Sequence, residues 1–286
     1  MNLNFWLIQA FNGISYGALL FLVGSGLSLI FGVMRIVNLS HGSYFLLGGY
    51  VALSVIWTTG SWLLAIPVAA LTIALVGVAM ERVFLRPLGF DPLRQVLLTV
   101  GFAFLFQQAA LDIWTGNNFD INPPDALTKS IVVGGLYLPL YRIFMIATAL
   151  IIGVALWLAM EKTRMGAAVR ATVDDAQMAR GVGIDTSRIS MLIFALGAFL
   201  AALGGVIGGA FLGIYPGLDF EMLPIAFAVV IIGGMGSLGG AAIGALVVGL
   251  ADNFGKALFP ELAYFTLFAP MALILAIRPT GLFGRA

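Results

Sequence analysis

Charged side chains are almost missing from the first part of the chain. Residues 1–80 carry a single formally charged side chain, Arg35, and the first acidic residue is Glu81. A soluble domain carries charge at about a quarter of its positions, whereas a helix that crosses a bilayer needs about 20 consecutive apolar residues. The run therefore predicts membrane-spanning helices. The first is expected at residues 1–31 as a retained span, because it lacks the basic start of a cleaved signal peptide.

The composition extends this conclusion to the whole chain. Of 286 residues, 61% are apolar and 9% are charged, with 14 basic against 13 acidic side chains. These values exclude an ordinary soluble enzyme and a disordered chain, and the absence of a basic excess excludes a nucleic-acid binder. The chain has no cysteine, which removes disulfides, thiolate metal sites and cysteine nucleophiles. No metal site is expected.

The apolar residues fall into long, Gly-, Ala- and Leu-rich stretches. These are residues 5–31, 41–57, 62–80, 96–114, 140–160, 189–213, 223–251 and 263–277. Strands of a membrane barrel would alternate apolar and polar residues, and no stretch does so. We therefore expect an all-α, polytopic transmembrane bundle of about eight spans, forming one domain over residues 1–286.

The basic residues predict the orientation of the bundle. Eleven of the fourteen fall on one side: Arg35, Arg82, Arg86, Arg94, Lys162, Arg164, Arg170, Arg180, Arg188, Arg278 and Arg285. An excess of Lys and Arg marks cytoplasmic loops. The segments expected on the other side, 115–139, 214–222 and 252–262, are mainly acidic, and the loop at about 115–138 is the longest external one.

Two apolar stretches are interrupted in a way that predicts broken helices. The middle of 223–251 reads Gly233-Gly234-Met235-Gly236-Ser237-Leu238-Gly239-Gly240, with five glycines in eight residues. A polar interlude, Asn38-Leu39-Ser40-His41-Gly42-Ser43, follows the first span. Broken helices of transporters place half-helix ends at the substrate. The alternative explanation for the glycines is close helix packing.

The chain shows no means of energising transport by itself. It contains no Gly-Lys-Ser/Thr triplet of a nucleotide-binding P-loop, and almost every acidic residue is expected in a loop rather than inside a span. The one histidine, His41, is interpreted as a structural residue at a helix start, with a proton relay as the alternative. We therefore expect no enzyme activity and no bound cofactor.

The cytoplasmic segment at about 161–188 contains a predicted surface helix. Asp174 and Asp175 are good helix-start residues, and Gly181 or Gly183 can end a helix. The flank Ala176, Ala179 and Val182 is small and apolar. We interpret the segment as a docking element, against the alternative of a solvated connector.

The sequence resembles a known family, the permease subunits of high-affinity branched-chain amino-acid ABC transporters of the LivH type. The likeness covers nearly the whole chain and is strongest at 31–42, 170–185 and 232–240. It implies a bacterial inner-membrane importer in which a periplasmic binding protein delivers the substrate. Two permeases, expected as a heterodimer, would form the path, and two ATP-binding subunits would dock below and hydrolyse ATP.

The resemblance also implies roles for particular residues. The segment Arg170–Asp185 is expected to couple to the ATPase subunits. The coupling residues are Arg170, Asp174, Asp175, Ala179, Gly183, Ile184 and Asp185. Apart from the resemblance, the broken-helix interpretation predicts that the substrate path is lined by Asn38, Ser40, His41, Gly42, Ser43, Gly233, Gly234, Met235, Gly236, Ser237, Gly239 and Gly240.

The substrate stays open at this stage. Permeases for urea, short amides or aromatic acids look similar over these motifs, and position 43 is Ser where many members of the family have an acid. A function of another class, a stand-alone channel for a small polar solute, would also use Gly-rich broken helices. Co-purifying ATPase chains and a second permease would favour the importer.

The two interrupted segments are expected to face each other and line the route, and cysteine substitution tests this. Because the native chain has no cysteine, Ser40→Cys and Ser237→Cys each introduce one thiol. We expect both thiols to react with a small water-soluble reagent at some stage of the ATP cycle. If neither reacts at any stage, the pathway assignment is wrong.

Overall fold

The computed structural model describes residues 2–89 and 91–284. The long helices are α1 Leu3–Met34, α2 His41–Thr59, α3 Trp62–Ala79, α4 Pro92–Trp114, α6 Leu140–Lys162, α7 Arg164–Asp174, α9 Thr186–Leu212, α10 Leu218–Gly233, α11 Leu238–Leu258 and α12 Ala263–Ile277. The shorter elements are α5 Asp125–Thr128, α8 Ala176–Gly181, β1 Ser130–Val133, β2 Leu136–Pro139, a π-helical turn at Met80–Leu85, and single turns at Arg86–Leu88 and Pro260–Leu262. The predicted helical membrane bundle is confirmed.

Seven helices of the described chain are long and apolar enough to cross a membrane. They are α1, α3 with its continuation to Leu88, α4, α6, α9, α11, and α12 with the turn before it. α2 matches the predicted stretch 41–57 but is not among the seven. It is an interior helix that carries polar residues such as His41, Ser43 and Tyr50, all of them buried.

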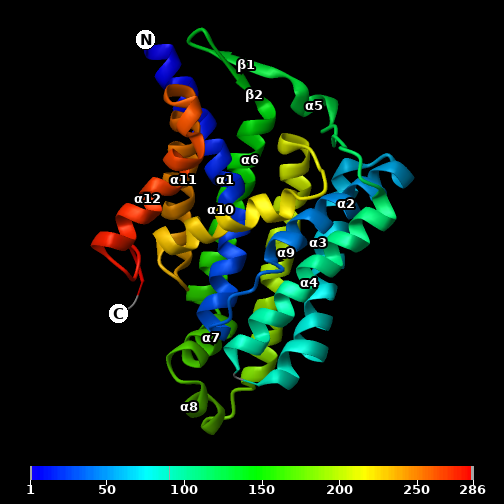
Figure 1. The fold of residues 1–286 in the computed structure, drawn as a ribbon, viewed down its shortest axis with the longest axis vertical. Coiled ribbons are helices and arrows are strands. Elements are labelled where there is room, and N and C mark those ends of the chain that lie inside the picture. Colours follow the sequence, from blue (N-terminus) through cyan, green and yellow to red (C-terminus); the bar gives the residue numbers. More distant parts are fainter. Residues whose placement is uncertain (1, 90, 285–286) are drawn as a thin grey trace.

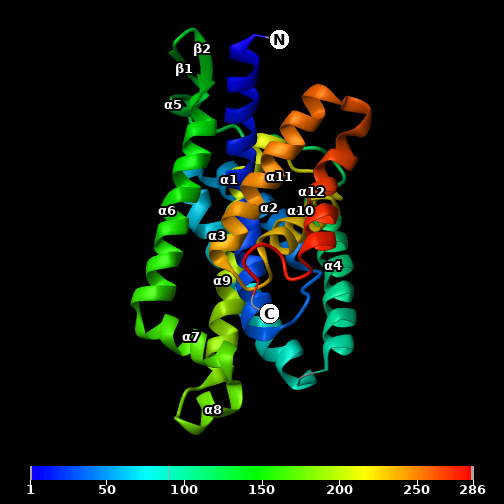
Figure 2. The ribbon, with the colours of Figure 1, turned by 90° about the vertical axis from the view of Figure 1, so that its left-hand side faces the viewer.

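α1 and α9 form the centre of the bundle. In their most apolar windows 72% of the residues are buried, compared with 17% in α4 and α6. Figure 2 shows α6 and α4 on opposite flanks, with α1, α2, α9 and α11 between them. The peripheral helices keep exposed leucine and isoleucine side chains, such as Leu97 and Ile151, which suits contact with lipid.

We name the end that carries α7 and α8, at the bottom of Figure 1, the cytoplasmic end, after the orientation that the basic residues predict. The opposite end, predicted to be external, carries the N-terminus and the β1–β2 hairpin. The hairpin lies within the external loop and was not predicted. The sequence signal was present, because Gly134-Gly135 lies between the β-branched run Ile131–Val133 and a second apolar run, a pattern typical of a hairpin turn. Of the predicted cytoplasmic arginines, Arg285 lies outside the described residues.

The predicted break in 223–251 is confirmed. α10 ends at Gly233 and α11 begins at Leu238, so four residues separate them. Figure 1 shows α10 lying across the bundle while α1, α6 and α11 run along its length. With 16 residues at 1.5 Å each, α10 is about 24 Å long and is shorter than the roughly 30 Å hydrocarbon layer. It therefore enters the bundle without spanning it.

α2 and α9 pack closely because Gly205 of α9 has no side chain at their contact. A Cβ placed on Gly205 of α9 would collide with the backbone carbonyl of Phe45 in α2 and lie 3.1 Å from the amide nitrogen of Gly49. Because both obstructing atoms belong to backbone, the helices would have to separate to admit a side chain. This contact fixes α2 against the central helix.

Gly205→Val should therefore destabilise the protein. We expect the free energy of unfolding to fall by about 1–3 kcal/mol because the core is overpacked. The midpoint of thermal unfolding in detergent should fall with it. Gly101→Val in α4 is the matched control, because a Cβ there meets nothing within 4 Å. Equal midpoints for the two variants would contradict this account of the α2–α9 contact.

Candidate functional site

A cavity of about 950 Å³ opens in the cytoplasmic half of the bundle. It lies between the end of α1, the break between α10 and α11, and the junction of α6 with α7. Its lining includes Arg35 and four residues of the predicted path, Met235, Gly236, Ser237 and Gly239. The cavity also reaches Arg170 and Asp174 of the predicted coupling segment, so one space joins the Gly-rich break to that segment.

Local hydrogen bonds give the break a fixed geometry. The Ser237 hydroxyl accepts a bond of 3.0 Å from the Gly240 amide, which caps the start of α11. The Ser28 hydroxyl of α1 donates to the Ser237 carbonyl at 3.3 Å. Free amides at the start of a long helix favour an anion such as a carboxylate.

The other glycines of the break have a packing role. Gly233 lies against Gly240, and the C-terminal segment covers the end of α10. The amides of Leu282 and Phe283 donate to the carbonyls of Ile232 and Gly233 at 2.9 and 3.0 Å. These bonds satisfy carbonyls that the end of a helix leaves without partners.

The polar interlude between α1 and α2 is buried and held mainly by its own side chains. The Asn38 side-chain oxygen accepts from the Ser40 amide at 3.1 Å and from the Ser40 hydroxyl at 2.7 Å. The His41 ring Nε2 lies 3.0 Å from the Val23 carbonyl. Asn38 Nδ2 and His41 Nδ1 have no hydrogen-bond partner. Gly42 and Ser43 contact Asp219 at the start of α10.

The structure thus separates the two groups of predicted path residues. The cytoplasmic cavity is lined by part of the break and by no residue of 38–43. The break packs against α1, where Gly236 meets Gly32, and the interlude packs against α10 instead. In this conformation position 237 is partly exposed at the cavity, whereas position 40 is fully buried.

Three acidic residues differ from the expectation that acids lie in loops. Asp219 lies in the first turn of α10, Asp252 lies within α11, and Glu81 lies in the π-helical turn, and all three side chains are buried. Asp252 pairs with Lys256 at 2.8 Å and Glu81 with Arg86 at 2.9 Å. Asp219 accepts a hydrogen bond of 3.1 Å from Ser43. The predicted stretches missed these positions, because two of them end just before Glu81 and Asp252 and the stretch 223–251 begins after Asp219.

Near Asp219, the loop that joins α9 to α10 carries Tyr215. Burial, together with the neighbouring Glu221 carboxylate, raises the pKa of the Tyr215 hydroxyl to about 12. The hydroxyl therefore stays protonated at neutral pH and donates to Glu221 at 2.9 Å. Glu221, unlike Asp219, is exposed.

The coupling segment contains two helices where one was predicted. Asp174 ends α7, and Asp175 begins α8 by accepting bonds of 2.9 Å from the amides of Gln177 and Met178. Ala179 is buried, and its carbonyl accepts from the Ile184 amide at 3.0 Å. Gly183 follows α8 with φ +88°, a conformation that side chains disfavour. Asp185 caps α9 through the Arg188 amide at 3.0 Å.

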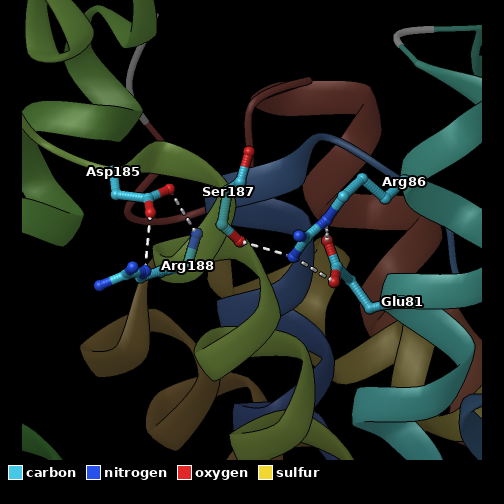
Figure 3. Close-up of polar contacts among 5 residues, drawn as sticks. All are labelled: Glu81, Arg86, Asp185, Ser187 and Arg188. Atoms are coloured by element: carbon cyan, nitrogen blue, oxygen red, sulfur yellow. Dashed lines mark hydrogen bonds and ion pairs between the residues drawn. The ribbon is translucent and has the colours of Figure 1, made fainter.

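Arg86 joins the start of α9 to the π-helical turn that follows α3, as Figure 3 shows. Arg86 donates to the Glu81 carboxylate at 2.9 Å and to the Ser187 carbonyl at 3.2 Å. Met80, the residue before Glu81 in the chain, accepts a bond of 2.7 Å at its sulfur from the Tyr44 hydroxyl. The Ser40 oxygen, whose hydrogen is donated to Asn38, lies 3.7 Å from the same sulfur. The π-helical turn therefore contacts the start of α9 through Glu81 and Arg86, and the buried interlude and α2 through Met80.

Comparisons with known proteins identify the family of the chain. A family model described as "Branched-chain amino acid transport system / permease component" matches residues 9–277. The chain is 32% identical to the high-affinity branched-chain amino acid transport system permease protein LivH of Escherichia coli K12, over 98% of this chain and 96% of LivH. It is 29% identical to BraD, a permease protein of the same system in Pseudomonas aeruginosa, over 98% and 96% of the two chains.

A more distant relative is the autoinducer 2 import system permease protein LsrC of Escherichia coli O9:H4, 30% identical over 66% of this chain and 56% of LsrC. No solved structure matches the chain. The match to the family model extends over all seven helices that can span a membrane. The chain belongs to the family of branched-chain amino-acid transport system permease components.

Proposed function

We propose that this multi-pass inner-membrane protein is the permease subunit of an ABC importer that moves branched-chain amino acids inward. The observation that carries the proposal is the cytoplasmic cavity, which touches both the Gly-rich break and the coupling residues Arg170 and Asp174. A movement of the coupling segment would therefore change the walls of the space through which a solute leaves. Family membership supports the same function.

The amides at the start of α11 suit the carboxylate of an amino acid, and Arg35 adds positive charge to the same cavity. The apolar part of the wall, with Leu29, Val33 and Leu238, suits a branched side chain. Neither the polar nor the apolar part of this wall would bind a substrate tightly, which suits a permease that must release the substrate on the inner side.

The energy would come from other chains. We propose two ATP-binding subunits beneath α7 and α8, a second permease beside this one, and a periplasmic binding protein at the external end. ATP would be hydrolysed by the partners, with no cofactor bound by this chain. α8 supports the docking of a partner, because Met178 and Val182 expose apolar side chains at the cytoplasmic end, 68% and 70% exposed respectively.

Reconstitution of the complete transporter in proteoliposomes tests the function. We expect leucine uptake to require both ATP and the binding protein, with no competition from urea or acetamide. The control replaces the binding protein with buffer. Leucine flux that continues without ATP would identify a channel, and uptake of urea in place of leucine would overturn the assignment of the substrate.

Gly183→Val tests the role of the coupling segment. Valine at φ +88° adds about 1–3 kcal/mol of backbone strain and should displace the exit from α8. We expect leucine uptake and binding-protein-stimulated ATP hydrolysis to fall together, while insertion in the membrane stays normal. Gly181→Val is the matched control, because its φ is not positive and a Cβ there meets nothing within 4 Å. Unchanged stimulated hydrolysis in Gly183→Val would refute the placement.

A further inference from the structure

The strongest unexplained group in the structure is the carboxylate of Asp219. It lies in the first turn of α10 with 2% of the residue exposed, in contact with the start of α2. One oxygen, Oδ2, accepts from the Ser43 hydroxyl at 3.1 Å, and the other, Oδ1, has no hydrogen-bond partner. The backbone of α2 comes close here because residue 42 is glycine, and a Cβ on it would collide with the Asp219 carbonyl.

No basic side chain of residues 2–89 and 91–284 forms an ion pair with this group. Five ion pairs occur among the described residues, and none of them includes Asp219. The other two buried carboxylates, Glu81 and Asp252, each have an Arg or Lys partner at 2.9 or 2.8 Å. A buried carboxylate without a counter-charge is expensive, and an ionisable residue inside a membrane protein is a sign of a functional site.

The surroundings of Asp219 are suited to a cation that carries an apolar group. Tyr50 lies seven residues after Ser43 on α2, thus on the same face and about 10 Å further along the helix. Its buried hydroxyl also has no partner. The Tyr50 ring stacks on Trp114 at 5.0 Å between centroids and meets the edge of Phe119 at 6.4 Å.

The external loop contributes part of this aromatic cluster. Phe119 is held by two backbone hydrogen bonds with Ile214, 2.8 and 2.7 Å long, and contacts Trp57 at 5.4 Å. The cluster of Tyr50, Trp57, Trp114 and Phe119 therefore joins α2 and α4 to the loop that follows α4 and to the segment before α10. Aromatic faces attract cations and also cover apolar side chains.

We propose that Asp219, with Ser43 and Tyr50, binds the ammonium group of the transported solute as it passes between α2 and α10. An ammonium group supplies three donors and the missing positive charge, so Oδ1 and the Tyr50 hydroxyl both gain a partner. The aromatic cluster covers the apolar side chain. This inference rests on the proposed function and adds to it a requirement for an amine.

A binding measurement on the purified, complete transporter without its binding protein tests the site. The probes are 3-methylbutylamine, which has the ammonium group and a branched chain, and 4-methylpentanoate, which has a carboxylate instead. Trp114 stacks on Tyr50, so tryptophan fluorescence reports occupancy. We expect the amine to give a saturable change and the acid to give none. An equal response to both probes, or no response to the amine, would overturn the proposal.

Asp219→Asn removes the charge while keeping the size of the side chain. We expect the dissociation constant of the amine to rise at least about tenfold, since a charge-assisted bond is lost. The control is Glu221→Gln on the same helix, because Glu221 is exposed and already accepts a bond from Tyr215. Amine affinity retained in Asp219→Asn would show that the carboxylate only stabilises the start of α10.

If Asp219→Asn does not assemble, a double variant that exchanges Ser43 and Asp219 tests the same site. The double variant Ser43→Asp, Asp219→Ser moves the carboxylate across a 3.1 Å hydrogen bond and keeps both groups. We expect the double variant to bind the amine, and an assembled double variant that does not bind it argues against recognition at this point. Amine binding by a complex that imports no leucine would refute the proposed substrate but not the ammonium site.

Discussion

Inside a bilayer no water is present to satisfy a broken helix, and this constraint organises the whole structure. Each interruption must find its hydrogen bonds within the protein. At the break between α10 and α11, the Ser237 hydroxyl caps one helix, and the amides of Leu282 and Phe283 cover the carbonyls of the other. At the interlude between α1 and α2, Asn38 and Ser40 bond to each other and Thr99 accepts from the Leu39 amide at 3.2 Å.

The same constraint explains why the broken elements are interior. α10 and α2 carry the polar groups that lipid would not tolerate, and the continuous helices α4, α6 and α12 surround them with apolar side chains. The close approach of α2 to α9 depends on glycine at positions such as Gly205. Function and packing therefore use the same small residues, and neither explanation of the glycines excludes the other.

Two regions connect the cytoplasmic surface with the interior. One is the cavity shared by Arg170, Asp174 and the Gly-rich break. The other is the series of contacts from Ser187 through Arg86 and Glu81 to the π-helical turn that begins at Met80. π-Helical turns occur frequently at functional sites. The end of α7 thus contacts the cavity directly, and the start of α9 contacts the π-helical turn directly.

The helical class, the break at Gly233–Gly240 and a short helix that starts at Asp175 could be predicted from the residues alone, because apolar run length, glycine density and capping residues are local properties. The contacts between distant segments could not be predicted in this way. The tertiary structure placed Asn38–Ser43 against Asp219 and the break against α1, whereas the sequence alone had led us to expect the two interruptions to face each other. The physical reason is that helix-end signals are read along the chain, whereas contacts such as Ser43 with Asp219, 176 residues apart, depend on how the helices cross.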